Sequence, residues 1–147
     1  RNSRYKMLCQ VAESIKPICH HDYTYHNIII DKNHRINVID FDYSCHELTC
    51  YDLAAVIQRV MRRLSFNIDI AIEMIIDYDR VKPVTDDEFV LMLSLFEFPQ
   101  RFWRVTDRYY SGKTQMSEEK FIKKYHEVVE DKEFMLDFID DFRRIIT

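Results

Sequence analysis

The sequence predicts a mainly α-helical protein with one small β-hairpin near its start. Two short runs rich in β-branched residues, 28–30 and 36–39, flank a polar turn, which is typical of a hairpin. After residue 50, apolar residues recur at three- and four-residue steps, as on the buried faces of helices. The length of 147 residues suits a single domain with one hydrophobic core.

The first part of the chain is expected to form a helix over residues 3–16, which ends before Pro17. The hairpin then covers roughly residues 27–40, with the polar segment 31–35 as its turn. Residues 42–49 are polar and predict a loop. The regular elements after this loop are all expected to be helices.

About five helices are predicted after the hairpin. The first starts at Tyr51 or Asp52, and the second covers about 68–80. The segment TDDE, residues 85–88, is a capping box that predicts the start of the third. Pro99 kinks this helix or starts a new one, and Gly112 is expected to end that segment as a C-terminal cap. Apolar periodicity predicts two last helices, over 118–130 and 132–146. The apolar stripe of the first helix is Leu53, Val56, Ile57, Val60, Met61 and Leu64.

Composition argues against several classes of function. Gly112 is the single glycine, so no glycine-rich loop can wrap a phosphate, and another segment would have to cover the phosphates of a nucleotide. The net charge of −4 argues against nucleic acid as the main partner. No uncharged apolar stretch predicts a membrane span. The four cysteines, without an apolar signal segment, are expected to be reduced cytosolic thiols.

A group of polar residues surrounds the predicted hairpin. His20, Asp22 and Asn27 form the pattern H-x-D-x-x-x-x-N, and Asp40 ends the returning strand. The hairpin is expected to bring Asn27 and Asp40 together, where an amide and a carboxylate oxygen suit Mg²⁺ with phosphate oxygens and water. Asp22 is placed to accept a proton from an incoming hydroxyl. The alternative is that these are ordinary turn and strand-end residues.

These residues resemble the catalytic loop and the following Asp-Phe pair of the protein-kinase-like superfamily. The form is closer to small-molecule kinases of the aminoglycoside and choline phosphotransferase type. More narrowly, the segments CHHDYTYHNI, VIDFDY, YDLAAVIQRV and FPQRFWRVTDRYYSGK resemble the C-terminal part of the CotS-type spore coat family. The early motifs are typical of the whole superfamily, and the aromatic segment FPQRFWRVTDRYYSGK is what indicates the CotS-type family within it.

The resemblance implies the helical C-terminal lobe of a protein-kinase-like fold. It implies that Asp22 is the catalytic base, that Asn27 and Asp40 bind Mg²⁺, that His20 is structural, and that Asp52 braces the loop through hydrogen bonds. Residues 1–147 would then form a single domain without the N-terminal, nucleotide-clamping lobe. We therefore expect the chain to be a piece of a longer protein, to bind ATP poorly and to be inactive alone.

Some residues depart from the protein-kinase pattern. Thr24 and Tyr25 stand where protein kinases carry other residues, so protein Ser/Thr substrates are not supported. Asp42 replaces the glycine of the kinase metal-binding triplet, so no activation-loop switch is inferred.

Three further groups allow more than one interpretation. The aromatic cluster is expected to be mainly core, with an acceptor pocket or a partner surface as alternatives; it comprises Phe96, Phe98, Phe102, Trp103, Tyr109 and Tyr110. Arg59, Arg62 and Arg63 are expected to form a solvated helix face. A zinc site is a weaker alternative to core thiols and loop hydrogen bonds for Cys19, His21, His26, Cys45, His46 and Cys50.

Taken together, the sequence predicts the C-terminal lobe of a kinase-like small-molecule phosphotransferase of the CotS type. The full-length protein would use ATP and Mg²⁺ and phosphorylate an alcohol group of an unknown acceptor. The alternative is a non-catalytic spore coat protein on a degenerate kinase fold, with other coat proteins as partners. Nucleic acid and membranes are not expected partners. The expected location is cytoplasmic synthesis followed by the spore coat.

Overall fold

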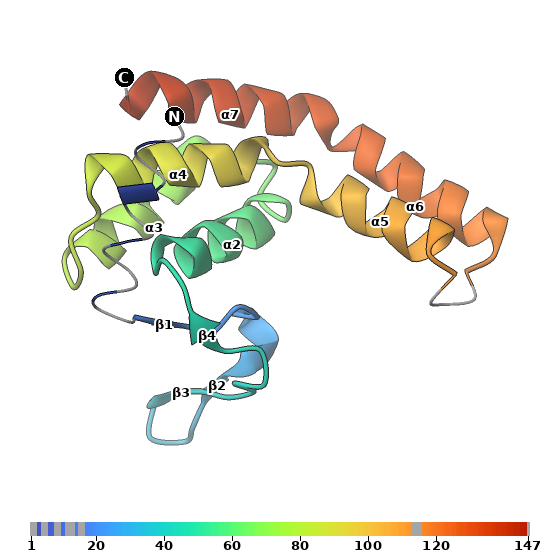
Figure 1. Cartoon of the computed structure of the whole chain (residues 1–147). Coiled ribbons are helices and arrows are strands. Elements are labelled where there is room, and N and C mark those ends of the chain that lie inside the picture. Colours follow the sequence, from blue (N-terminus) through green and yellow to red (C-terminus); the bar gives the residue numbers. More distant parts are fainter. Residues whose placement is uncertain are drawn as a thin grey trace.

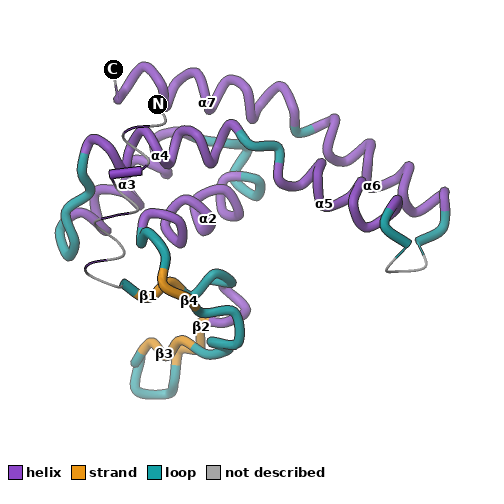
Figure 2. Tube along the Cα trace, in the orientation of Figure 1, coloured by secondary structure: helices purple, strands orange, loops and turns teal. Residues whose placement is uncertain are grey.

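The computed structural model describes residues 3, 6, 7, 10, 14, 17–112 and 116–146. Within these residues the chain forms two small two-stranded sheets and the helices α2 to α7 (Figure 1). The helices form the body of the molecule, and the strands lie together below α2 (Figure 2). The expected helix over residues 3–16 lies outside the described residues, apart from isolated positions.

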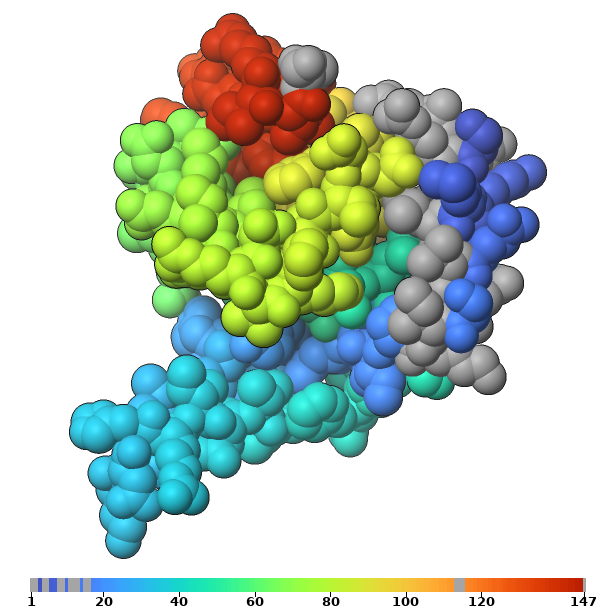
Figure 3. Space-filling view, turned by 90° about the vertical axis from the view of Figure 1, so that its left-hand side faces the viewer, coloured from blue at the N-terminus to red at the C-terminus, as the bar shows by residue number. Residues whose placement is uncertain are grey.

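The predicted hairpin is confirmed. Strands β2 (Ile28–Ile30) and β3 (Ile36–Val38) pair antiparallel, with the first residue of β2 opposite the last of β3. The turn between them is built by Asp31, whose Oδ1 accepts the backbone N–H groups of Asn33 at 2.8 Å and Arg35 at 2.9 Å. The hairpin projects from the helical body as an arm (Figure 3).

A second strand pair corrects the prediction of a loop over residues 42–49. Strand β4 (Cys45–His46) lies within that segment and pairs antiparallel with β1 (Ile18–Cys19). The thiol of Cys19 is fully buried and contacts the backbone oxygens of Glu47 and Leu48, each at 3.2 Å. A two-residue ladder is too short to show an alternating pattern, so its pairing depends on a partner that is distant in sequence.

The core lies among four helices: α2 (Cys50–Met61), α3 (Ile68–Asp79), α4 (Asp86–Glu97) and α7 (Lys132–Ile146). Helix α2 packs against α3 and α4, and α4 packs against α7. Each helix contributes apolar side chains to one cluster, which includes Leu53, Ile57, Met61, Ala71, Ile75, Met92, Leu93, Phe96, Phe138, Ile139 and Phe142. The ring of Phe96 meets those of Phe138 and Phe142 edge-on, at centroid distances of 5.4 and 5.0 Å.

Helix α2 is shorter than its apolar stripe suggested. It ends at Met61, and Leu64 lies beyond it with 42% of its surface exposed. The carbonyl of Met61 accepts the N–H of Phe66 at 2.8 Å, and Ser65 and Phe66 both take positive φ values, 52° and 56°. This tight turn reverses the chain before the stripe can continue.

The predicted helix ends at positions 85 and 112 are confirmed. The Thr85 hydroxyl accepts the N–H of Glu88 at 3.3 Å, and the Glu88 carboxylate accepts the N–H of Thr85 at 2.9 Å, which is a complete capping box. Pro99 separates α4 from a new helix, α5 (Gln100–Tyr110). Gly112 follows α5 with φ of +66°, the left-handed conformation that glycine adopts without steric cost.

Helices α5 and α6 (Glu118–Glu130) form an antiparallel pair that extends away from the core (Figure 1). The Tyr109 and Phe121 rings stack between them at 4.1 Å. The predicted ranges of α6 and α7 are confirmed. Of the helices that the structure describes, none combines the length and the apolar character that a membrane span needs.

The aromatic cluster is mostly not core, contrary to the expectation from its spacing. Phe96 is buried, but Phe98, Phe102, Trp103 and Tyr110 are exposed. The reason is the position of α5, which leaves the core at Pro99 and has no fully buried residue.

Candidate functional site

The loop between β1 and β2 folds back on itself and brings Asn27 to Asp22. The Thr24 hydroxyl accepts the N–H of His26 at 3.2 Å, and the Thr24 carbonyl accepts the N–H of Asn27 at 2.9 Å, which closes a short 3₁₀ turn over Tyr25–Asn27. The side-chain amide of Asn27 then donates to the main-chain oxygen of Asp22 at 2.9 Å and to its carboxylate at 3.3 Å. Asn27 is buried, so this arrangement is held inside the protein.

His20 ties this loop to the end of β3. Its ring is buried, with Nε2 at 2.9 Å from the carbonyl oxygen of Ile39 and Nδ1 at 3.3 Å from the backbone nitrogen of Asp22. A carbonyl only accepts and a backbone N–H only donates, so both contacts are satisfied when the neutral ring carries its proton on Nε2. The structure therefore gives His20 a positioning role between the two segments.

Asp52, in the first turn of α2, holds the beginning of the loop. Its carboxylate accepts the backbone N–H of His20 at 2.6 Å and that of His21 at 2.9 Å. His21 has a φ of +61°, which is unfavourable for a residue with a side chain. The two charge-assisted hydrogen bonds offset this strain and link the loop to the helical core.

Asp40 lies just beyond the returning strand β3, and no hydrogen bond joins its side chain to that of Asn27 in the described part of the chain. The N–H of Ile39 donates to the main-chain oxygen of Asn27 at 2.9 Å. Asp40 is the residue after Ile39, so its backbone lies at the same end of the hairpin as Asn27. Asp40 is exposed and has a φ of +65°. The amide nitrogen of Asn27 faces Asp22, so its carbonyl oxygen Oδ1 is the atom that a cation would take. An amide oxygen with a carboxylate is a donor set that suits Mg²⁺.

Asp22 has a second partner that the sequence did not predict. Its Oδ1 forms an ion pair with Arg59 of α2 at 3.0 Å. The carboxylate is thus held from two sides, by the Asn27 amide and by the Arg59 guanidinium. The Asp22 side chain keeps 38% of its surface exposed, so a ligand can still reach it.

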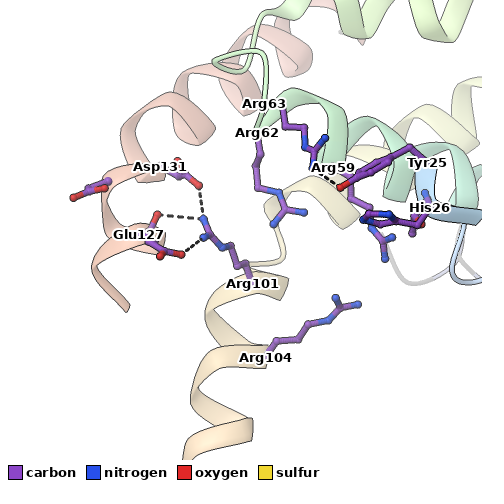
Figure 4. Close-up of a pocket in the computed structure, with 11 residues that line it drawn as sticks. Tyr25, His26, Arg59, Arg62, Arg63, Arg101, Arg104, Glu127 and Asp131 are labelled. Carbon is purple, nitrogen blue, oxygen red and sulfur yellow. Dashed lines mark hydrogen bonds and ion pairs between the residues drawn. The ribbon is translucent and has the colours of Figure 1, made fainter. Parts of the chain in front are cut away.

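An arginine-lined cavity opens next to this loop (Figure 4). It has a volume of about 620 Å³ and lies between the loop segment 24–26, α2, α5 and α6. The expectation of a solvated arginine face agrees with the exposure of Arg62 and Arg63, and these arginines also line the cavity. The lining residues are Thr24, Tyr25, His26, Arg59, Arg62, Arg63, Arg101, Arg104, Glu127, Glu130 and Asp131.

A second, more apolar cavity of about 590 Å³ shares four of these arginines and Asp131. Phe96, Phe98 and Phe102 line it, which agrees with the alternative that part of the aromatic cluster borders a pocket. His21 also lines it, stacked on Tyr51 at 4.5 Å, and its buried Nε2 has no hydrogen-bond partner within the described part of the chain. Arg59, which contacts Asp22, lines both cavities.

The cysteines and histidines do not gather into a metal site among the described residues. No group of three or more His, Cys, Asp or Glu side chains there is arranged to hold a metal ion. Burial, followed by nearby negative charges, raises the pKa of Cys19 and of Cys50 to about 12, so both remain protonated thiols at neutral pH. Cys19, Cys45 and Cys50 are free, and Cys9 lies outside the described residues.

Comparison with known proteins identifies the family. The model of the family described as choline/ethanolamine kinase matches residues 2–82, more than half of the chain. The chain belongs to the choline/ethanolamine kinase family. The match includes the whole loop, the hairpin and α2, which supply His20, Asp22, Asn27, Asp40 and Asp52.

A solved structure shows the same fold. The crystal structure of an aminoglycoside phosphotransferase from Alicyclobacillus acidocaldarius matches with a TM-score of 0.81 and 18% sequence identity. The match covers 93% of this chain and 40% of the other, so the chain spans less than half the length of that enzyme. The predicted fold class, mainly helical with a small hairpin and kinase-like, is confirmed. A search of curated proteins found no match.

Proposed function

We propose that the chain is the C-terminal lobe of an ATP- and Mg²⁺-dependent kinase that phosphorylates a hydroxyl group of a small molecule. The observation that carries the proposal is the geometry of Asp22. Its carboxylate is held by Asn27 and Arg59 and remains accessible, and Arg59 also lines a cavity of small-molecule size. Membership of the choline/ethanolamine kinase family and the kinase-like fold support the same reaction type.

In this mechanism Asp22 is the general base. The acceptor oxygen forms a bond to the terminal phosphorus of ATP, and the bond from that phosphorus to the bridging oxygen of ADP breaks. The hydroxyl proton passes to a carboxylate oxygen of Asp22, which has lone pairs beyond those used by Asn27 and Arg59. The products are ADP and a phosphate ester. Because His20 and Asp52 fix the loop, the carboxylate is oriented before the acceptor arrives.

Asn27 and Asp40 are the residues that would hold Mg²⁺. Both supply oxygen ligands, and backbone pairing brings them to one end of the hairpin. Bound there, the cation would neutralise charge on the transferred phosphate. Removing either side chain is expected to weaken the dependence of ATP binding on magnesium.

A second lobe is part of this proposal, since a single glycine leaves the chain without a loop to cover phosphates. Apolar side chains on and around the hairpin are exposed, and surfaces of this kind are usually covered by another domain or partner. They are Ile29, Ile30, Ile36, Ile39, Phe41 and Tyr43. We infer that an N-terminal lobe covers them and supplies the contacts to the nucleotide.

The narrower CotS-type assignment is also a proposal. It rests on the motifs of the loop and of the aromatic segment 98–113, and it implies a place in the spore coat with other coat proteins as partners. A non-catalytic coat protein is the competing possibility. We do not extend choline or ethanolamine, named in the family description, to this chain, because arginines line the cavity and repel ammonium groups.

The test is phosphoryl transfer by the longer polypeptide that carries this chain with an N-terminal lobe. Formation of ADP is measured with magnesium, ATP and a panel of hydroxyl compounds, for the wild type and for Asp22→Asn. Loss of the general base is expected to lower turnover about 10²- to 10⁴-fold. Asp31→Asn, in the hairpin turn, is the matched control and is expected to retain activity.

Equal turnover in wild type and Asp22→Asn would remove Asp22 from the role of base. No turnover with any acceptor, together with no magnesium-dependent binding of ATP by the longer polypeptide, would instead favour the non-catalytic coat protein.

A further inference from the structure

We propose that the arginine-lined cavity binds a phosphate group on the acceptor, so that the substrate is an already phosphorylated, hydroxyl-bearing small molecule. This inference rests on the proposed kinase function and specifies its substrate class. The cavity is lined by five arginines, which come from α2, the residues directly after it and α5, and by three carboxylates from α6 and its C-terminal end. Positive charge is therefore in excess, even when the Asp22 carboxylate paired with Arg59 is included, and a phosphate group would offset it.

Three of the arginines already have partners. Arg59 pairs with Asp22 at 3.0 Å. Arg101 pairs with Glu127 at 2.9 Å and with Asp131 at 2.5 Å, and so joins α5 to the α6–α7 junction. Arg63 lies over the ring of Tyr25, at 4.2 Å from the centroid, and donates to its hydroxyl. These contacts shape the walls of the cavity.

Arg62 and Arg104 are the two that remain for a ligand. Neither forms an ion pair with any residue that the structure describes, and Arg62 donates only to the carbonyl of Gln58, within its own helix, at 3.3 Å. Both extend into the space between α2 and α5 (Figure 4). Two guanidinium groups from different helices can bind one phosphate from two sides.

The electrostatic setting of Arg62 supports an anion in this place. Partial burial of its guanidinium, followed by the like charges of Arg101 and Arg59, lowers its pKa. Arg104 contributes in the same direction, while Asp131 opposes the shift. Crowding of like charges is unfavourable without a ligand, and an anion between them relieves it.

The cavity also adjoins the loop that carries Asp22. Arg59 lines it and contacts the Asp22 carboxylate, and Thr24, Tyr25 and His26 from the loop itself form another wall. A molecule whose phosphate lies between Arg62 and Arg104 can therefore extend toward Asp22 with its hydroxyl group. The adjoining cavity lined by Phe98 and Phe102 leaves room for the rest of the molecule.

Binding by the 147-residue chain tests this directly, since it does not require catalysis. The probes are glycerol 3-phosphate, glycerol, choline and inorganic sulfate, measured by calorimetry at low salt. We expect glycerol 3-phosphate to bind more tightly than the other three. In the double variant Arg62→Gln/Arg104→Gln its dissociation constant is expected to rise at least about tenfold.

Two variants serve as controls. Arg80→Gln removes an exposed arginine at the end of α3, which forms an ion pair with Asp77 three residues away, and should leave binding unchanged. Arg62→Lys/Arg104→Lys keeps the charge and should recover part of the affinity, which separates ligand contact from altered folding. Thermal unfolding of each variant verifies that the fold is retained.

The proposal is overturned if glycerol 3-phosphate binds no better than glycerol or sulfate, or if the double variant binds it as tightly as the wild type. The longer polypeptide separates this result from the kinase function. Asp22→Asn should lower transfer about 10²- to 10⁴-fold and leave binding of glycerol 3-phosphate intact. Transfer that depends on Asp22 but not on Arg62 and Arg104 would overturn the proposed phosphate site and leave the proposed kinase function standing.

Discussion

At the scale of single residues, Asp52 controls the conformation of the candidate catalytic loop. One carboxylate accepts the backbone N–H groups of two successive residues, His20 and His21. The second of these has a positive φ, so the loop would relax to another conformation if the hydrogen bonds were lost. Asp22 follows directly, and its position depends on the same contacts.

Replacing Asp52 with asparagine tests this dependence. The amide has the shape of the carboxylate, but only one of its oxygens remains as an acceptor, so one backbone N–H loses its partner. We expect unfolding by urea to show a loss of about 1–3 kcal/mol in stability. Asp77→Asn, in an exposed ion pair with Arg80, is the control and should change stability by less than about 0.5 kcal/mol. Equal effects of the two changes would contradict the role given to Asp52.

At the scale of elements, the start of α4 is fixed by local chemistry. The capping box of Thr85 and Glu88 satisfies two backbone N–H groups that no helix can satisfy by itself. Helix α4 then packs against both α2 and α7 and carries Phe96 into the core. The cap therefore stabilises the helix that holds the core together.

Thr85→Ala is expected to lower the free energy of unfolding by about 1 kcal/mol. A suitable comparison is Thr106→Ala in α5, where the hydroxyl donates to carbonyls of its own helix, those of Phe102 and Trp103. Alanine has the higher helix propensity, so that change should be nearly neutral. Thermal unfolding followed by circular dichroism measures both. A larger loss for Thr106→Ala than for Thr85→Ala would show that the cap contributes little.

At the scale of the whole molecule, the hairpin is the part least covered by the rest of the chain. Ile30 and Ile36 pair across it and are 65% and 69% exposed. Apolar side chains in this position gain free energy from any surface that covers them. Where no second lobe covers these side chains, the hairpin of another copy of the chain can cover them.

We therefore expect the isolated chain to self-associate through the hairpin at high concentration. The double variant Ile30→Thr/Ile36→Thr keeps residues that favour strands and removes apolar area, so it should sediment as a monomer where the wild type does not. Val81→Thr, at an isolated position with 88% exposure, is the control and should behave as the wild type. Identical sedimentation of all three proteins would contradict this.

Much of the fold could be predicted because its signals are local. Hairpin strands, amphipathic helices, the capping box and Gly112 each depend on residues that are close together in the chain. The paired strands β1 and β4 were missed because their partners are distant and the ladder is very short. The exposure of Phe98 and Phe102 was missed because periodicity shows that a helix has an apolar face but not what covers it.

For the candidate site, the sequence by itself determined which residue types lie in the loop and hairpin: His20, Asp22, Asn27, Asp40 and, at the start of α2, Asp52. Their spacing is sufficient because a loop and a hairpin are short-range structures. Only the tertiary structure decided that Arg59 pairs with Asp22 and that arginines of α2 and α5 enclose one cavity. Those arginines are far apart in sequence, and α5 follows α4, which packs against α2, so no local pattern could reveal that they line one cavity.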